Sequence, residues 1–234
     1  MRTFTVAGLI LVVLASLTAC PSAQRGSLEE GLDAWSEGDY PEALRLFEPL
    51  AEKGNAEAQF HLGMMYEEGK GKPQNHAEAA SWYSRSAQQD HAKAQNHLGI
   101  LYVRGMGVVQ DPEQARKWFQ MAADQGYAEA RYNLGLIYYL GEGVPQDDVE
   151  AVRWIRMAAE QGLPRAQVSM GMAYLSGRGV EQESVLAYMW FDLGAAQGDF
   201  QGMAARENLS QIMTPEQIEE AQRLARQWEA EHAQ

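Results

Sequence analysis

The sequence predicts an all-α protein that forms an α-solenoid, a superhelix of tandem antiparallel helix pairs. Three observations support this class. The sequence repeats at an offset of 36 residues, and glycines and alanines recur at fixed places in the repeats. Within each repeat, apolar residues follow the spacing of three and four that suits one face of a helix. With 46% hydrophobic and 22% charged residues, the composition fits an ordered, water-soluble protein.

The chain opens with a short apolar segment, which predicts a signal peptide over residues 1–19. Its apolar run at 6–17 falls short of the ~20 residues that a membrane-spanning helix needs. The segment ends in the letters LTAC at 17–20, which resemble the lipobox of bacterial lipoproteins. The resemblance implies that Cys20, the only cysteine in the sequence, carries a lipid. Residues 20–27 would then be the lipidated cysteine and a polar tether.

The lipobox also implies a location. A lipidated Cys20 would hold the protein on the bacterial cell envelope, facing the periplasm. The next residue is Pro21 rather than Asp, and by analogy with enteric lipoproteins this favours the outer membrane. Because no second cysteine exists, the chain can form no disulfide within itself.

Each repeat is predicted to hold two helices, as the third repeat illustrates. Helix A covers about 130–140, and helix B covers about 148–161. Gly141 and Gly143 end helix A, because glycine accepts the left-handed conformation that closes a helix. Asp147 with Glu150 resembles the capping box that starts a helix. Gly135 lies inside helix A, where glycine costs about 1 kcal/mol, so we predict that it makes room for a neighbouring helix.

Four such units cover about 58–201 without gaps. Residues at identical places include Trp82, Trp118, Trp154 and Trp190; Tyr66, Tyr102, Tyr138 and Tyr174; and Gly63, Gly99, Gly135 and Gly171. The third unit matches the pattern A-x3-LG-x2-Y-x2-G-x-GV-x2-D-x3-A-x2-W-x4-A-x2-G at nearly every position. This pattern resembles the Sel-one-like repeat (SLR), a relative of the tetratricopeptide repeat (TPR). The resemblance implies a superhelix of stacked helix pairs.

The flanking segments fit the same architecture. Residues 28–54 resemble a TPR-like unit, with Gly31, Ala43 and Phe47 at that family's spacing. Residues 202–231 are predicted to form C-terminal capping helices, the last of which starts at Thr214 and carries a charged outer face. Residues 28–234 are therefore predicted to form one α-solenoid.

Charge and motifs exclude several function classes. A net charge of −13 argues against nucleic acid as a partner, which would need clustered Lys and Arg. We find no catalytic motif, so the sequence predicts a protein that is not an enzyme and uses no cofactor or metal. His61 and His97 occupy equivalent places and would allow a metal shared between units, but a generic polar position on helix A is favoured.

The predicted binding surface is the concave face. In TPR-like solenoids one edge of each helix A lines that face, and large apolar side chains there suit recognition of a peptide or helix. The leucine-glycine pair sets the register, which predicts these partner-binding residues: Phe60, Met64, Asn96, Val103, Tyr132, Leu136, Tyr139, Val168 and Leu175. The row of Met64, Ile100, Leu136 and Met172 could instead pack between units.

The leading hypothesis is a non-enzymatic scaffold or adaptor, anchored to the envelope by a lipid, that binds an unidentified partner protein through its concave groove. The resemblance is compatible with signalling regulation and with envelope or export assembly. One alternative is a cell-wall-acting hydrolase or penicillin-binding-like enzyme. A third is a co-chaperone-like adaptor for carboxyl-terminal tails, for which only Lys93 and Arg165 offer basic groups at a suitable row. The oligomeric state is left open.

Overall fold

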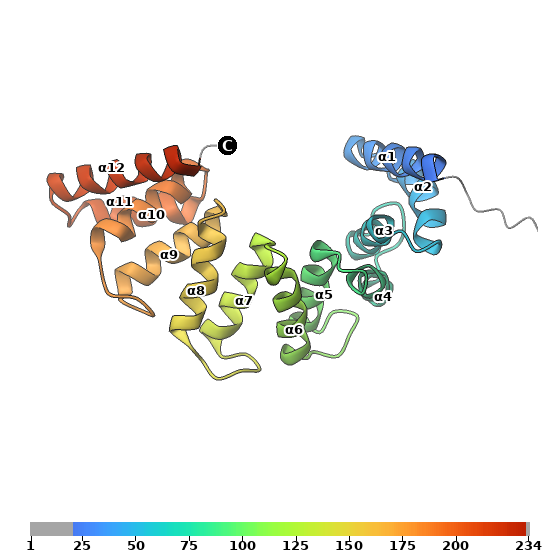
Figure 1. The fold of residues 1–234 in the computed structure, drawn as a ribbon, viewed down its shortest axis with the longest axis horizontal. Helices are drawn as coiled ribbons and strands as arrows, with labels where there is room; N and C mark the ends of the chain where they lie inside the picture. The colour runs from blue at the N-terminus through green and yellow to red at the C-terminus, as the bar shows by residue number, and fades with distance from the viewer. Residues whose placement is uncertain (1–20, 233–234) are drawn as a thin grey trace, which may run out of the picture.

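A computed structural model describes residues 21–232, with side chains from Ser27 onward. This part of the chain holds twelve helices and no strand, which confirms the predicted all-α solenoid (Figure 1). The predicted signal peptide at 1–19 and Cys20 lie outside the described residues. Among the helices described, none combines the length and the apolar character that crossing a bilayer requires.

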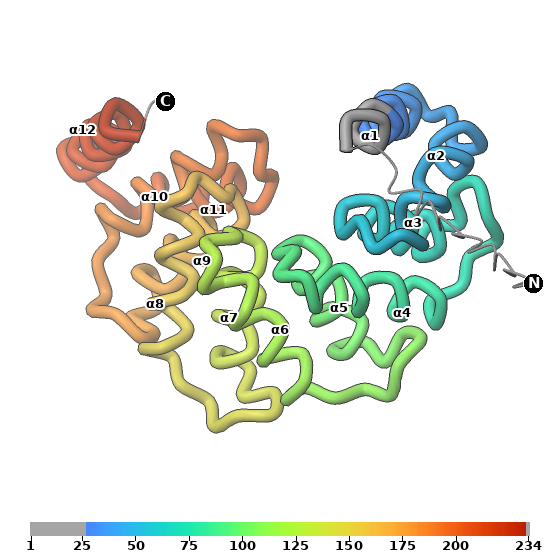
Figure 2. The backbone as a smooth tube through the Cα atoms, turned by 45° about the vertical axis from the view of Figure 1, so that its right-hand side comes forward, coloured from blue at the N-terminus to red at the C-terminus, as the bar shows by residue number. Residues whose placement is uncertain are grey.

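The helices follow one another as antiparallel pairs. The first pair is α1 (Pro21–Glu37) and α2 (Tyr40–Glu52). The four 36-residue units comprise α3 (Ala56–Glu68) with α4 (His76–Ala87), α5 (Ala92–Arg104) with α6 (Pro112–Asp124), α7 (Ala128–Leu140) with α8 (Asp148–Ala159), and α9 (Pro164–Ser176) with α10 (Ser184–Ala196). The chain ends in α11 (Phe200–Ser210) and α12 (Pro215–His232). The pairs form an open arc, with α3, α5, α7 and α9 on its inner side and α4, α6 and α8 outside (Figure 2).

Helix α1 begins at Pro21, so the segment predicted as a polar tether is helical from that residue onward. Proline suits the first turn of a helix, since its fixed backbone angle fits and its missing N–H would have no helical partner. Ala23, Gln24 and Arg25 then favour continuation of the helix.

The glycine inside each helix A lies against a large side chain of helix B. A Cβ atom at Gly135 would sit 2.6 Å from Cγ1 of Ile155 and 3.0 Å from the carbonyl oxygen of Ala151. The other pairs bring a ring to the same place: a Cβ atom would lie 2.7 Å from Phe47 at Gly31, 2.6 Å from Tyr83 at Gly63, 2.6 Å from Phe119 at Gly99 and 2.5 Å from Phe191 at Gly171. The predicted role of Gly135 is therefore confirmed, because the two helices can approach this closely only where helix A lacks a side chain.

The turn between the helices of a pair also follows the sequence. Gly141 and Gly143 have φ angles of 72° and 73°, in the left-handed region that glycine tolerates. Helix α8 then starts at a cap, where the N–H of Glu150 donates to Oδ1 of Asp147 at 3.0 Å.

Buried glutamines join successive units. Gln95 is fully buried, and its Nε2 donates to the carbonyl oxygen of Ala87 at the end of α4. Its Oε1 accepts a hydrogen bond of 2.7 Å from Gln125 at the end of α6. Gln59 and Gln167 make the same pair of contacts in their own units. Each of these side chains therefore joins the helix B before it to the helix B of its own unit.

The last helix closes the end of the solenoid. Helix α12 packs on α10 through the buried Ala221 and Ala225. The rings of Trp190 and Trp228 meet edge to face, with centroids 6.1 Å apart. The α10 side of the final unit is thus covered by α12 rather than left open to water.

The glycine contact predicts a specific coupling between two residues. In Gly171→Ala, the new Cβ would meet the Phe191 ring at 2.5 Å. Such overpacking costs about 1–3 kcal/mol, against about 1 kcal/mol gained from helix propensity, so we expect a lower free energy of unfolding. Replacing Phe191 with Leu as well should recover part of that loss in a double-mutant cycle measured by urea denaturation. Strictly additive effects would contradict the packing account, and Asn208→Ala on the exposed face of α11 is the control.

Candidate partner-binding groove

A groove of about 240 Å³ opens between α7 and α9. Both helices lie on the inner side of the arc (Figure 2). Its base consists of Val152, Ile155 and Val168, which are at most 7% exposed. Leu136 and Ala173 form its half-buried walls. The groove is therefore apolar where it is deepest.

The rim of the groove combines two exposed apolar side chains with polar ones. Tyr139 is 37% exposed and Met172 is 47% exposed. The polar residues of the rim are Ser169, Ser176, Arg178 and Gln201. A bound segment would thus meet an apolar base and hydrogen-bonding groups at the edge, the usual arrangement in protein binding sites.

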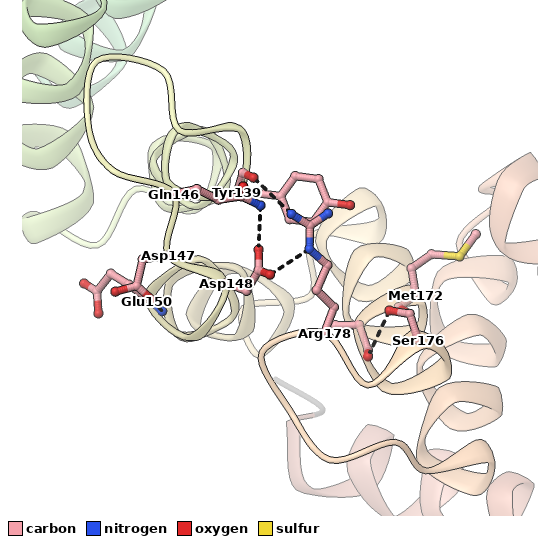
Figure 3. A network of polar contacts seen from close by, with 9 residues as sticks. Tyr139, Gln146, Asp147, Asp148, Glu150, Met172, Ser176 and Arg178 are labelled. Atoms are coloured by element: carbon pink, nitrogen blue, oxygen red, sulfur yellow. Dashed lines mark hydrogen bonds and ion pairs between the residues drawn. The ribbon is translucent and has the colours of Figure 1, made fainter.

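At one end, Arg178 stacks on Tyr139 (Figure 3). The centre of its guanidinium lies 3.8 Å from the ring centroid, and its Nε donates to Oδ2 of Asp148 at 2.8 Å. Gln146 donates to the other oxygen of Asp148 at 3.3 Å. The hydrogen bond from Arg178 holds the pKa of Asp148 below its usual range, so this carboxylate stays ionised. Asp148 therefore fixes Arg178, and Arg178 covers the ring of Tyr139.

The other end carries a second arginine over a tyrosine. Arg165 lies 4.9 Å from the ring centroid of Tyr132, and Ser169 donates to the hydroxyl oxygen of Tyr132 at 3.5 Å. Arg165 is exposed. Within the described part of the chain, its guanidinium has no carboxylate within 4.0 Å. This cation is consequently available to a partner.

The predicted partner-binding residues do not all share one surface. Leu136, Tyr139 and Val168 line the groove. Tyr132 lies at its end, half-buried under Arg165. Met64, Val103 and Leu175 are half-buried and stand outside the groove.

Three of the residues predicted to line the concave face are buried. Phe60, Asn96 and Val168 are each 4% exposed. Phe60 is packed among histidine rings, and Asn96 accepts a hydrogen bond from Asn133 of the next unit at 2.8 Å. Val168 forms part of the groove's base but packs against α10 and α11, at Gly194 and Gly202. Phe60 and Asn96 therefore face neighbouring helices rather than solvent, whereas Val168 still lines the groove.

Sequence reasoning missed Ile155 and Arg178. Arg178 follows α9 in an irregular turn, where no periodic pattern could mark it. The sequence does mark Ile155, because the equivalent positions of the other three units hold the aromatic residues Tyr83, Phe119 and Phe191.

A cluster of histidines and aromatic residues marks the first two units. The ring of Phe60 contacts His61, His91 and His97, with centroids 4.9–5.4 Å apart. Two glutamates pair with these histidines: Glu57 contacts His61 and His91, and Glu67 contacts His97. His61 and His97 thus have different carboxylate partners, and the described residues contain no group of three or more His, Cys, Asp or Glu able to hold a metal ion.

Hydrogen bonds set the charge state of both glutamates. Those from His61 and then His91 hold the pKa of Glu57 far below its usual range. Burial raises the pKa of Glu67, but hydrogen bonds from His97 and Tyr83 outweigh it and lower the pKa overall. Burial and the adjacent Glu67 raise the pKa of Tyr83, so its hydroxyl stays protonated and donates to Glu67. The cluster is thus a bonded structural unit in which Nδ1 of His61 is the one buried side-chain nitrogen or oxygen that lacks a hydrogen-bond partner among the described residues.

A larger depression lies at the carboxyl ends of α8 and α10, beside α12. Its volume is about 740 Å³, and its lining includes Glu160, Gln161, Glu229 and Glu231. Trp228 stacks on His232 there, with centroids 4.1 Å apart. Because carboxylates and amides dominate this depression, it lacks the apolar base of the groove between α7 and α9.

The lowered pKa of Glu57 predicts a pH-dependent contribution to stability. A carboxylate whose pKa is lowered by folding stabilises the fold above its unfolded pKa, about 4.3, and loses that effect as pH falls. We therefore expect Glu57→Gln to reduce the free energy of unfolding most at about pH 5–6, with the difference from wild type shrinking toward about pH 3. Urea denaturation at several pH values measures this. A difference that stays constant with pH would contradict the account, and Glu219→Gln on the exposed face of α12 is the control.

Comparisons with known proteins place the chain among repeat proteins. A profile of the Sel1 repeat, the SLR of the sequence pattern, matches residues 26–55, 56–91, 92–127, 128–163 and 164–199. The first matched segment spans the unit that resembles a TPR. A search of curated proteins found no match.

Solved structures agree with the profile. A Sel1 repeat protein from Oxalobacter formigenes is 31% identical, with a TM-score of 0.70, over 77% of this chain and 74% of that one. The protective antigen c5321 of uropathogenic Escherichia coli, which has an SLR fold, is 31% identical with a TM-score of 0.57. That match covers 90% of this chain but only 54% of the antigen. A putative Sel1 repeat protein from Klebsiella pneumoniae, 21% identical with a TM-score of 0.55, shares the fold over 80% of this chain and 93% of its own.

Proposed function

Because this chain belongs to the Sel1 repeat family, we propose that it is a non-enzymatic scaffold that binds a partner protein through the groove between α7 and α9. Sel1 repeats generally mediate protein–protein interaction and are generally non-catalytic. The observation that carries the proposal is the apolar groove on the inner side of the arc, with Tyr139 and Met172 exposed at its rim. Apolar surface of this kind suits the recognition of a peptide or a helix.

We further propose that the scaffold acts at the bacterial envelope. The lipobox letters at 17–20 support a lipid on Cys20, which would hold the solenoid on the periplasmic side of the outer membrane. Helix α1 follows almost directly from Cys20, so the arc would stand close to the membrane surface. Signalling regulation and envelope or export assembly are both compatible with a membrane-held scaffold. No observation on the described residues favours the alternative of a cell-wall hydrolase or penicillin-binding-like enzyme.

Site-specific photocrosslinking in cells tests the groove. A photoreactive phenylalanine analogue at position 172 should capture a partner protein, because Met172 stands at the rim with 47% of its surface exposed. The matched control is position 121 in α6, an outer helix, where Met121 is 40% exposed. The double variant Tyr132→Ala, Tyr139→Ala should remove the adduct at 172 without unfolding the protein. Equal capture at both positions would argue against the groove.

Membrane attachment is tested separately. In Cys20→Ser the thiol that would carry the lipid is gone, so we expect the protein to move from the membrane fraction to the soluble periplasmic fraction. Fractionation followed by immunoblotting measures the distribution. Variant protein that remains with the membranes would rule out anchoring through Cys20 and would leave the groove proposal intact.

A further inference from the structure

We propose that the groove between α7 and α9 takes one aromatic side chain of the partner protein, and that a carboxylate beside this ring in the partner pairs with Arg165. This inference rests on the proposed function, because it specifies what that groove recognises. It follows from comparing the third unit with the other units of the same chain.

The third unit lacks the ring that the other units have. Ile155 stands where the neighbouring units have Tyr83, Phe119 and Phe191. Each of those rings covers the glycine of its own helix A and is at most 2% exposed. Ile155 covers Gly135 in the same way but is smaller, and it lines the groove. The groove therefore occupies space next to a position that is aromatic elsewhere in the solenoid.

The next unit contributes a second small residue. Where the first two units meet, the rings of Tyr83 and His97 pack with centroids 5.1 Å apart. The equivalent residues where the third and fourth units meet are Ile155 and Ser169, and both line the groove. The two rings between the first two units thus correspond to two smaller side chains and a space of about 240 Å³ between the third and fourth units.

The size and lining of this space select its occupant. Its 240 Å³ fall below the roughly 300 Å³ at which pockets for drug-sized molecules begin, so it suits a single side chain. The base is apolar, and an equivalent place in this chain packs rings against similar helices. An aromatic residue that fills such a pocket commonly supplies much of the binding energy at a protein interface. The size of the space, its apolar base and the rings at the equivalent place therefore all favour an aromatic side chain of the partner.

Charge at the rim of the groove indicates which residues of the partner lie beside its aromatic side chain. Arg178 is already paired with Asp148, whereas Arg165 has no carboxylate partner in the described residues. Arg165 precedes Ser169 by one helical turn on α9, so it lies next to the groove along the same face. In a chain of net charge −13, this exposed arginine is a local exception that favours a carboxylate. Acidic surface elsewhere would repel the same segment, which confines it to the groove.

Peptide binding tests the proposal without knowledge of the partner. The probe is a fluorescein-labelled peptide of sequence Ser-Gly-Glu-Phe-Glu-Gly-Ser, compared with versions in which Ala replaces Phe or Lys replaces both Glu. Titration of the full-length protein by fluorescence anisotropy should show binding at least about tenfold weaker for both altered peptides. Equal affinity of the Phe and Ala peptides would overturn the assignment of a ring. Equal or tighter binding of the Lys peptide would overturn the assignment of a carboxylate.

Filling the groove from within provides the matched variants. Ile155→Phe restores the residue type of the second and fourth units, and Ser169→His restores the residue type of the second unit. Both should keep the thermal midpoint near that of wild type and weaken binding of the Phe peptide at least about tenfold. Met121→Leu on the outer helix α6 should leave the affinity for this peptide unchanged. Having two filling variants keeps the test decisive if one of them folds poorly. Arg165→Gln should weaken binding of the Phe peptide, which carries two Glu, but not binding of the version in which Lys replaces both Glu.

The same variants separate this inference from the proposed function. If position 172 captures a partner in cells and Ile155→Phe leaves the adduct unchanged, the scaffold function stands and the ring pocket is wrong. If position 172 captures nothing above position 121, the scaffold function fails at this groove. If Ile155→Phe and Ser169→His both remove the adduct while the proteins remain folded, both proposals are supported.

Discussion

The packing of a glycine in one helix against a large side chain in its partner helix governs this solenoid. At each of the five pairs from α1 and α2 to α9 and α10, the glycine of helix A leaves space that helix B fills, which brings the two axes close together. The buried glutamines then link neighbouring units, so the spacing within a pair and the spacing between pairs are both set by repeated contacts. Curvature follows from these repeated contacts, because every unit adds a similar displacement and rotation.

The candidate site arises in the third unit. There the contact between the glycine of helix A and helix B is kept, but the aromatic residue of helix B is replaced by a smaller one. Ile155 still covers Gly135, so α7 and α8 pair as the others do. The side chain stops short of the inner side of the arc, and Ser169 of the next unit does not extend to meet it. A binding groove thus appears without any change in backbone architecture. Arg165 then gives one end of the groove a positive edge, whereas Arg178 at the other end is paired with Asp148.

Much of the fold could be predicted from the sequence, but less of the groove. The period, the role of Gly135 and the caps depend on local residues, and the structure agrees with each. The direction of the row that contains Phe60, Asn96 and Val168 depends on how adjacent A helices rotate against each other, which no single helix encodes. Arg178 was missed because it follows a helix end, and its role appears only when the turn meets Tyr139. Of the predicted residues, Leu136, Tyr139 and Val168 thus line the groove, whereas Phe60 and Asn96 are buried elsewhere.

We infer that Ile155 keeps the pairing of α7 with α8 and, together with Ser169 of the next unit, opens the groove. A crystal structure of the Ile155→Phe variant tests it most directly. We expect the new ring to lie over Gly135 as Phe119 lies over Gly99, with the groove filled and the axes of α7 and α8 unmoved. An open groove, or a shift of α7 away from α8 to admit the ring, would contradict the claim.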